Sequence, residues 1–207
     1  MSESDELIRD IGSNIQEKAA LIWSVADTLR GPYKPHEYGL VILPMTVIKR
    51  FHDCLLPTHD KVLAAAKKYN NFAVKDGFLR EASGYPFYNT SKFTFETLKA
   101  DPENIGENFR DYLNGFSDNV QDILARMNFS DQVERLSDPD APMLYQVVSD
   151  FCSPKADMSP DKIKAVDMGY IFENLIQRFS ESYDEDAGAH FTSRDIVYLM
   201  TDLLIAA

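Results

Sequence analysis

The feature that most constrains the fold is a strongly apolar stretch between residues 40 and 56. Its apolar side chains are Val41, Ile42, Leu43, Met45, Val47, Ile48, Phe51, Leu55 and Leu56. A helix that is apolar around most of its circumference has to be surrounded by other elements. The stretch therefore predicts a central buried helix, in which Pro44 lies in the first turn or kinks the helix because an interior proline removes a hydrogen bond.

Helical periodicity extends over most of the remaining chain. In residues 5–30, apolar side chains recur every three or four positions, which predicts a long amphipathic helix that ends at Gly31-Pro32. Further helices are predicted over 58–69, 101–115, 117–127, 133–136 and 143–151. Their expected starts are Thr58, Asp101-Pro102-Glu103 and Ser117, and Ser159-Pro160-Asp161 is a further expected start that opens a junction between two units.

Residues 71–97 have a different character, because glycine, proline and asparagine separate short aromatic runs. We expect a long loop here with at most one small β-hairpin. Its aromatic residues Phe87, Tyr88, Phe93 and Phe95 either anchor the loop to the core or form a platform on which bases stack. The anchoring role is the more usual explanation for aromatic side chains in an irregular segment.

Composition narrows the classes of function. The formal net charge is −12, so an isolated domain of this kind should bind DNA poorly, and a DNA contact has to be local or shared with a partner. No apolar run is long enough to cross a membrane, and the amino terminus M-S-E-S-D-E lacks the features of a signal peptide, so we expect a cytoplasmic protein. His52, Cys54 and His59 are close in sequence, but a fourth metal ligand is missing, and we predict no metal site.

Two amphipathic helices are predicted at the carboxyl end. The first has an apolar stripe along 168–179, and the second carries apolar positions from Ile196 to Leu204. Thr192 and Asp195 have the spacing of a capping box, which makes Thr192 a helix cap on local grounds. With the helices upstream, the fold class is mainly α: a multi-helix N-terminal bundle followed by the first helices of another unit.

Three blocks of sequence, in the right order, resemble one family. These are G-Y-P-F-Y-N-T-S-K-F-T-F at 84–95, D-P-E-N-I with L-N-G-F-S-D-N-V between 101 and 120, and the run from Met168 to Leu204. They are similar to the modification subunit of type I restriction–modification systems, an adenine-N6 DNA methyltransferase. The resemblance implies an N-terminal helical domain at 1–163 and the start of an α/β methyltransferase domain at 164–207.

In that family the segment written here as H-F-T-S-R is similar to a motif that contacts the methyl donor, S-adenosylmethionine. By position, the resemblance assigns cofactor binding to Ala189, His190, Phe191, Thr192, Ser193 and Arg194. A loop that enters a helix offers free backbone amides and a hydroxyl to a carboxylate. The family usually has proline where this chain has Ser193, and proline would pre-set the entry into the helix.

The family's other motifs, Asp-Pro-x-x-Gly-x-Gly for the donor and Asn-Pro-Pro-Tyr/Phe for catalysis, do not occur in residues 1–207. We therefore assign no catalytic residue and expect a fragment that is inactive alone. The intact protein is expected to methylate adenine in double-stranded DNA together with a specificity subunit, a restriction subunit and a second modification subunit.

Two further questions stay open at this point. Phosphate contacts could be made by Lys49, Arg50, Lys67, Lys68, Lys92 and Arg110, although each is more simply explained as part of a solvated helix face. The alternative function is a helical scaffold for protein–protein contacts without enzymatic activity. A stand-alone enzyme has little support, because no nucleophile motif or phosphate-binding loop accompanies the many acidic residues.

Overall fold

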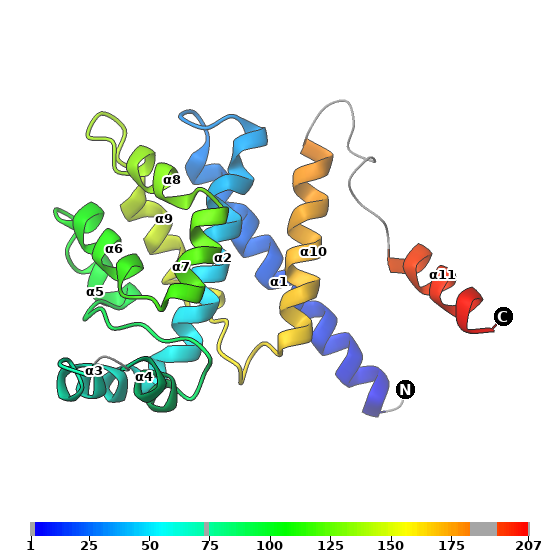
Figure 1. The fold of residues 1–207 in the computed structure, drawn as a ribbon. Coiled ribbons are helices and arrows are strands. Elements are labelled where there is room, and N and C mark those ends of the chain that lie inside the picture. Colours follow the sequence, from blue (N-terminus) through cyan, green and yellow to red (C-terminus); the bar gives the residue numbers. More distant parts are fainter. Residues whose placement is uncertain (1–2, 73–74, 183–193, 207) are drawn as a thin grey trace.

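The apolar stretch forms helix α2, Tyr38–Leu55, at the centre of the molecule (Figure 1). This computed structural model describes residues 3–72, 75–182 and 194–206. Val41, Ile42 and Ile48 are completely buried, which confirms the prediction of a central buried helix. Pro44 is the seventh residue of α2 and lies beyond the first turn, so the first of the two placements that the sequence left open is wrong. Pro44 lacks a backbone N–H and so removes one hydrogen bond of α2. The helix continues through it, packed on the surrounding helices.

Helix α1, Glu3–Leu29, packs along α2 and α10, Ala165–Ser182. The amphipathic helices predicted over residues 5–30 and along 168–179 both form. The chain leaves α1 through Gly31, whose φ of +108° lies in the region that favours glycine. Pro35–Glu37 forms a short 3-10 helix, η1, that leads into α2.

Helices α3 to α9 complete the bundle around α2, and α11 stands apart from it (Figure 1). Their bounds are His59–Lys68 for α3, Asp76–Ser83 for α4, Phe95–Lys99 for α5, Ile105–Asn114 for α6, Asp118–Arg126 for α7, Phe129–Leu136 for α8, Leu144–Phe151 for α9 and Arg194–Ala206 for α11. Two further 3-10 helices are Leu56–Thr58, η2, and Pro154–Ala156, η3. The fold is mainly α, as predicted.

The described residues contain no β-strand. Their isolated bridges join Arg30 to Tyr33 and Asn89 to Phe116. The expectation of a long loop over 71–97 is wrong in part, because helices α4 and α5 form within or at the edge of it. Gly84 does end α4, with a φ of +74°.

Three of the predicted helix starts are wrong in mechanism. The hydroxyl of Thr58 donates to the carbonyl of Ser83 at 3.0 Å instead of capping α3. Asp101 accepts hydrogen bonds from the side-chain amides of Asn104 and Asn108, and α6 begins only at Ile105. Ser117 does precede α7, but its hydroxyl donates to the side chain of Asn119. In each case, the side chain that was expected to cap a helix has another partner.

The predicted start at 159–161 is also wrong. Residues 157–164 form a turn-rich connector, and α10 begins at Ala165, where Asp167 accepts the amide hydrogen of Lys164 at 3.0 Å. Met168, Ile171, Leu175 and Phe179 of α10 belong to the same hydrophobic core as α1 and α2. The domain boundary at 163/164 stays a prediction. The apolar side chains of α11 between Ile196 and Ile205 that the structure describes are all exposed.

Candidate functional site

The predicted donor-binding loop, residues 189–194, lies between α10 and the start of α11 and almost entirely outside the residues that the structure describes. Ala189, His190, Phe191, Thr192 and Ser193 lie outside the described residues. Arg194 is the first residue of α11, and its side chain lies outside them too. The residues that the sequence assigned to S-adenosylmethionine therefore stay a prediction. What the structure does describe is how α10, the helix that leads to this loop, is held against the bundle.

A buried ion pair on α2 forms the first part of that attachment. The ammonium group of Lys49 lies 2.5 and 2.7 Å from the two carboxylate oxygens of Asp53, and both side chains are almost fully buried. The backbone amide of Met158, in the connector, donates to one of these oxygens at 2.7 Å. Burial raises the pKa of Asp53, whereas Lys49 and the Met158 amide act to lower it. Asp53 thus joins α2 to the connector.

Two further cations bind backbone carbonyls of the same region. The guanidinium of Arg50 donates to the carbonyl oxygens of Met158 and Ile163, the latter at 2.8 Å. The ammonium of Lys18, on α1, donates to the carbonyl of Lys155 at 2.6 Å. Residues 155–164 are therefore held mainly through their own main-chain atoms. The helix that follows them, α10, packs against α1 and α2.

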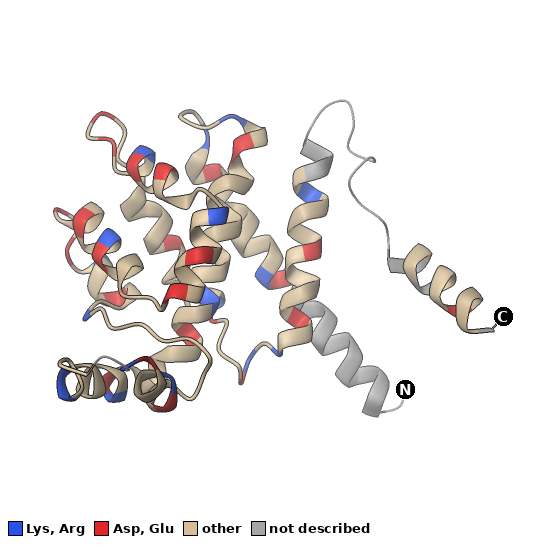
Figure 2. Ribbon diagram, in the orientation of Figure 1, with Lys and Arg blue, Asp and Glu red and all other residues tan. Residues whose placement is uncertain are grey.

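These contacts change the interpretation of the predicted phosphate-binding residues. Lys49 and Arg50 are engaged within the bundle, so the structure does not offer them to a phosphate. Lys67, Lys68, Lys92 and Arg110 are exposed. Figure 2 shows that acidic residues are distributed over most of the described helices, in keeping with the negative charge of the chain.

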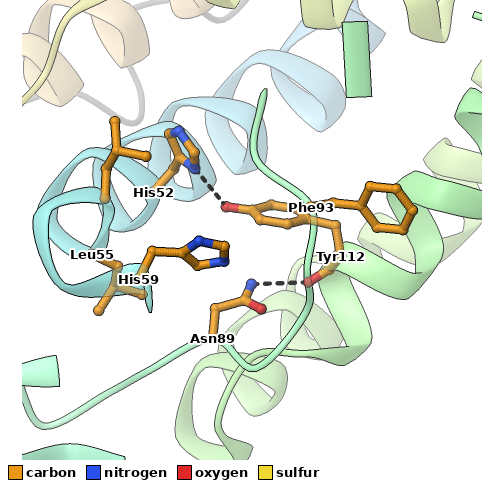
Figure 3. A pocket seen from close by; sticks show the side chains of 7 residues that line it. His52, Leu55, His59, Asn89, Phe93 and Tyr112 are labelled. Atoms are coloured by element: carbon orange, nitrogen blue, oxygen red, sulfur yellow. Dashed lines mark hydrogen bonds between the residues drawn. The ribbon is translucent and has the colours of Figure 1, made fainter. Parts of the chain in front are cut away.

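A small hollow beside the carboxyl end of α2 contains the two histidines considered as metal ligands (Figure 3). A ring nitrogen of His52 (Nδ1) lies 3.2 Å from the hydroxyl of Tyr112, and Nε2 of His59 lies 2.9 Å from the carbonyl oxygen of Ser91. Burial lowers the pKa of His52 to about 3, which keeps the ring neutral. Asn89 closes the hollow by donating to the Tyr112 carbonyl at 3.0 Å.

This arrangement has the character of a hydrogen-bonded core rather than a reactive site. Within the described residues, no group of three or more His, Cys, Asp or Glu side chains is placed to hold a metal ion. Phe95, one of the aromatic residues considered as a base-stacking platform, is buried against His52 with ring centroids 4.9 Å apart. Phe87 packs on Phe51 at 4.7 Å. Both contacts support the anchoring interpretation.

Sequence reasoning overlooked the anchoring role of the charged residues on α2. The available signal was the occurrence of Lys49, Arg50 and Asp53 in a helix that is otherwise almost entirely apolar. Charged groups in such a position have to be paired or to bind backbone groups. Lys49 and Asp53 are partners one helical turn apart, but the backbone partners of Arg50 and Asp53 lie more than a hundred residues away along the chain.

The helical bundle, with its central α2 and tethered α10, defines an all-α domain without a described catalytic centre. Comparison with protein families matches residues 18–151, more than half of the chain, to the HsdM N-terminal domain. The chain therefore belongs to this family, the N-terminal domain of the modification subunits of type I restriction–modification systems. No curated protein and no solved structure matches the chain. None of the described helices has the length and apolar character needed to cross a membrane.

Proposed function

We propose that this chain is the N-terminal part of an adenine-specific DNA methyltransferase subunit, and that its helical domain serves subunit assembly and closure around DNA. The intact protein would transfer a methyl group from S-adenosylmethionine to N6 of adenine. The match of residues 18–151 to the HsdM N-terminal domain is the observation that carries this proposal. The expected partners are the specificity and restriction subunits, a second modification subunit and double-stranded DNA, and the expected location is the cytoplasm.

The residues proposed to contact the methyl donor are those from Ala189 to Arg194. They follow α10, whose place beside α1 and α2 is fixed by the buried apolar stripe and by the tethered connector. They also lead into α11, and a loop that enters a helix can present free backbone amides to the carboxylate of the donor. S-adenosylmethionine supplies the methyl group when bound, and the chain's own contribution is to position this loop.

Titration calorimetry with S-adenosylmethionine tests the assignment of the cofactor. Residues 1–207 lack the glycine motif of the family, so we expect no measurable heat of binding by this chain and saturable binding by the intact subunit. Micromolar affinity of residues 1–207 alone would contradict the view that the missing motifs hold the donor. Absence of binding by the intact subunit would contradict the proposed activity.

A pair of threonine variants in the intact subunit tests the loop itself. Thr192→Ala should weaken donor binding by more than its effect on stability accounts for. Thr201→Ala is the matched control, because its hydroxyl only donates to the Val197 carbonyl within α11, at 2.8 Å. If Thr192→Ala lowers the unfolding temperature but leaves the donor Kd unchanged, Thr192 is a helix cap and no more.

DNA binding provides an independent test of the role in closure. The acidic chain alone should bind duplex DNA weakly at physiological salt, and the assembled complex should bind it tightly, with a strong dependence on salt concentration. Fluorescence anisotropy with a labelled duplex over a salt series measures both. Tight, salt-insensitive binding by this chain would contradict a shared DNA interface.

A further inference from the structure

Helices α3 and α4 pack against each other and present a cluster of aromatic side chains to solvent. Tyr69 and Phe78 are stacked, with ring centroids 4.3 Å apart and an angle of 13° between the planes. The ring of Phe72 meets both of them edge-on, at 5.5 Å from Tyr69 and 6.4 Å from Phe78. Phe72 is 55% exposed and Phe78 is 40% exposed. We call these three residues the aromatic cluster.

Exposed lysines occur in the same segment of the chain as the aromatic cluster, and one of them contacts it. Lys61, Lys67, Lys68 and Lys75 are all exposed, and none of them forms an ion pair with a residue that the structure describes. The ammonium of Lys68 lies 4.9 Å from the centre of the Tyr69 ring. These four cations are therefore available to an external negative charge.

The local charge is opposite to that of the molecule. Residues 59–83 contain five Lys and Arg against three Asp and Glu, whereas the whole chain contains 21 against 33. An exposed aromatic patch of this kind costs solubility unless a partner covers it. Aromatic side chains surrounded by charged groups are typical of the centre and rim of a protein–protein interface.

The geometry of the rings favours a protein partner over a nucleic acid. A base that stacks on an aromatic residue needs a free ring face. In the aromatic cluster, Tyr69 and Phe78 already cover one face of each other, and Phe72 meets them edge-on. The cluster is thus a preformed apolar projection, which suits a pocket better than a base.

From these observations we infer that the aromatic cluster is a docking point for another protein subunit. The partner presents an apolar pocket bordered by aspartate or glutamate side chains, which face Lys61, Lys67, Lys68 and Lys75. Phe72 and Phe78 enter the pocket and contribute most of the affinity, whereas the lysines accelerate association and select an acidic partner. This inference rests on the proposed function, because it places the partner among the subunits of the same assembly.

The test uses the intact subunit and its purified specificity and restriction subunits. Phe72→Ser combined with Phe78→Ser should raise the Kd for one of these subunits by about tenfold or more, measured by titration calorimetry. The matched control is Ile123→Ser combined with Tyr145→Ser, since these residues are similarly exposed, at 42% and 39%, on α7 and α9. Circular dichroism and the unfolding midpoint verify that both double variants are folded.

A charge variant supplies a second readout. Lys67→Glu combined with Lys68→Glu should slow association with the same subunit and weaken its dependence on salt, while the dissociation rate changes little. Stopped-flow kinetics at low and high salt measures these effects. An unchanged association rate would contradict the acidic character of the pocket.

The other outcomes are decisive as well. Unaltered binding of both subunits by the Phe72 and Phe78 variant overturns the inference. So does a loss confined to DNA binding, which would assign the aromatic cluster to nucleic acid, or a loss confined to self-association in sedimentation velocity, which would assign it to a second copy. If the unsubstituted protein binds neither subunit, the proposed function itself fails.

Discussion

Asp53 lies one helical turn from Lys49, receives two short contacts from its ammonium group, and accepts the backbone amide of Met158 with the same carboxylate. The arrangement satisfies an acid, a base and a backbone donor inside a helical bundle. Because Asp53 is the shared acceptor, removing it leaves the ammonium group of Lys49 and the Met158 amide without this partner.

Asp53→Ala should therefore destabilise the protein strongly, by about 3–5 kcal/mol, because it leaves a buried ammonium group unpaired. Replacement of both residues, Lys49→Met with Asp53→Leu, should cost less than the single change, because no charge stays buried. Urea denaturation followed by circular dichroism measures both free energies of unfolding. A double variant that is less stable than Asp53→Ala would contradict this account.

The neutral ring of His52 makes stability depend on pH. The pKa of His52 is about 3 in the folded protein and 6.5 in the unfolded chain. Between pH 3 and pH 6.5, the unfolded chain therefore binds a proton that the folded protein does not. The free energy of unfolding should fall as the pH is lowered, by about 2.5 kcal/mol between pH 7 and pH 4.5 from this residue alone. Urea titrations of the native protein and of His52→Gln at both pH values isolate the effect. Parallel pH dependence in the two proteins would rule it out.

Gly115 is expected to tolerate no side chain. A Cβ atom at this position would lie 2.5 Å from the backbone nitrogen of Ser91 and 2.3 Å from the Oδ1 atom of Asn89. Gly115→Ala should destabilise the protein by about 2 kcal/mol or more, since the backbone has to shift. Gly169→Ala, in α10, meets nothing within 4 Å and should stabilise by about 0.5–1 kcal/mol. Thermal unfolding should thus move in opposite directions for the two variants.

Arg135 ties α8 to the segment between α1 and α2. Its guanidinium donates to both carboxylate oxygens of Glu37 and lies 3.9 Å from the centre of the Tyr33 ring. These hydrogen bonds lower the pKa of Glu37 to about 2. Arg135→Lys keeps the charge but loses the planar fork and the stacking, so we expect a loss of about 1 kcal/mol. Equal stability of the two proteins in urea would show that charge alone suffices.

Hydrophobic spacing was enough to predict the helices that bury one broad apolar face. Helices α1, α2, α9 and α10 follow the predicted ranges closely, because the spacing of their apolar residues identifies the face that is buried. Helices α4 and α5 escaped prediction because glycine and aromatic residues interrupt the pattern there. Their place in the fold depends on tertiary contacts, such as the packing of α5 on α9.

Three predicted caps and the suggested phosphate contacts of Lys49 and Arg50 failed for a common physical reason. Ser117 and Thr58 stand at helix starts, but more distant groups compete for their hydroxyls. Arg50 has the chemistry of a phosphate ligand, yet two carbonyls beyond residue 155 occupy it. The sequence pattern predicts which face of a helix a residue occupies. The hydrogen-bond partner of its side chain depends on which distant residues lie next to it in the folded protein. The donor-binding loop, assigned by resemblance, stays a prediction.

The tethering of the connector through main-chain atoms has an evolutionary consequence. Lys18 and Arg50 bind carbonyl oxygens, and Asp53 binds an amide, so these bonds do not depend on which side chain stands at 155 or 158. Substitutions at the exposed connector positions 160–162 and 164 therefore preserve the tether, whereas proline at 158 would remove the amide donor. Selection on this junction thus acts on the helices that hold the connector and on its buried side chains Met158 and Ile163, whereas its exposed positions are free to diverge among relatives that keep the same architecture.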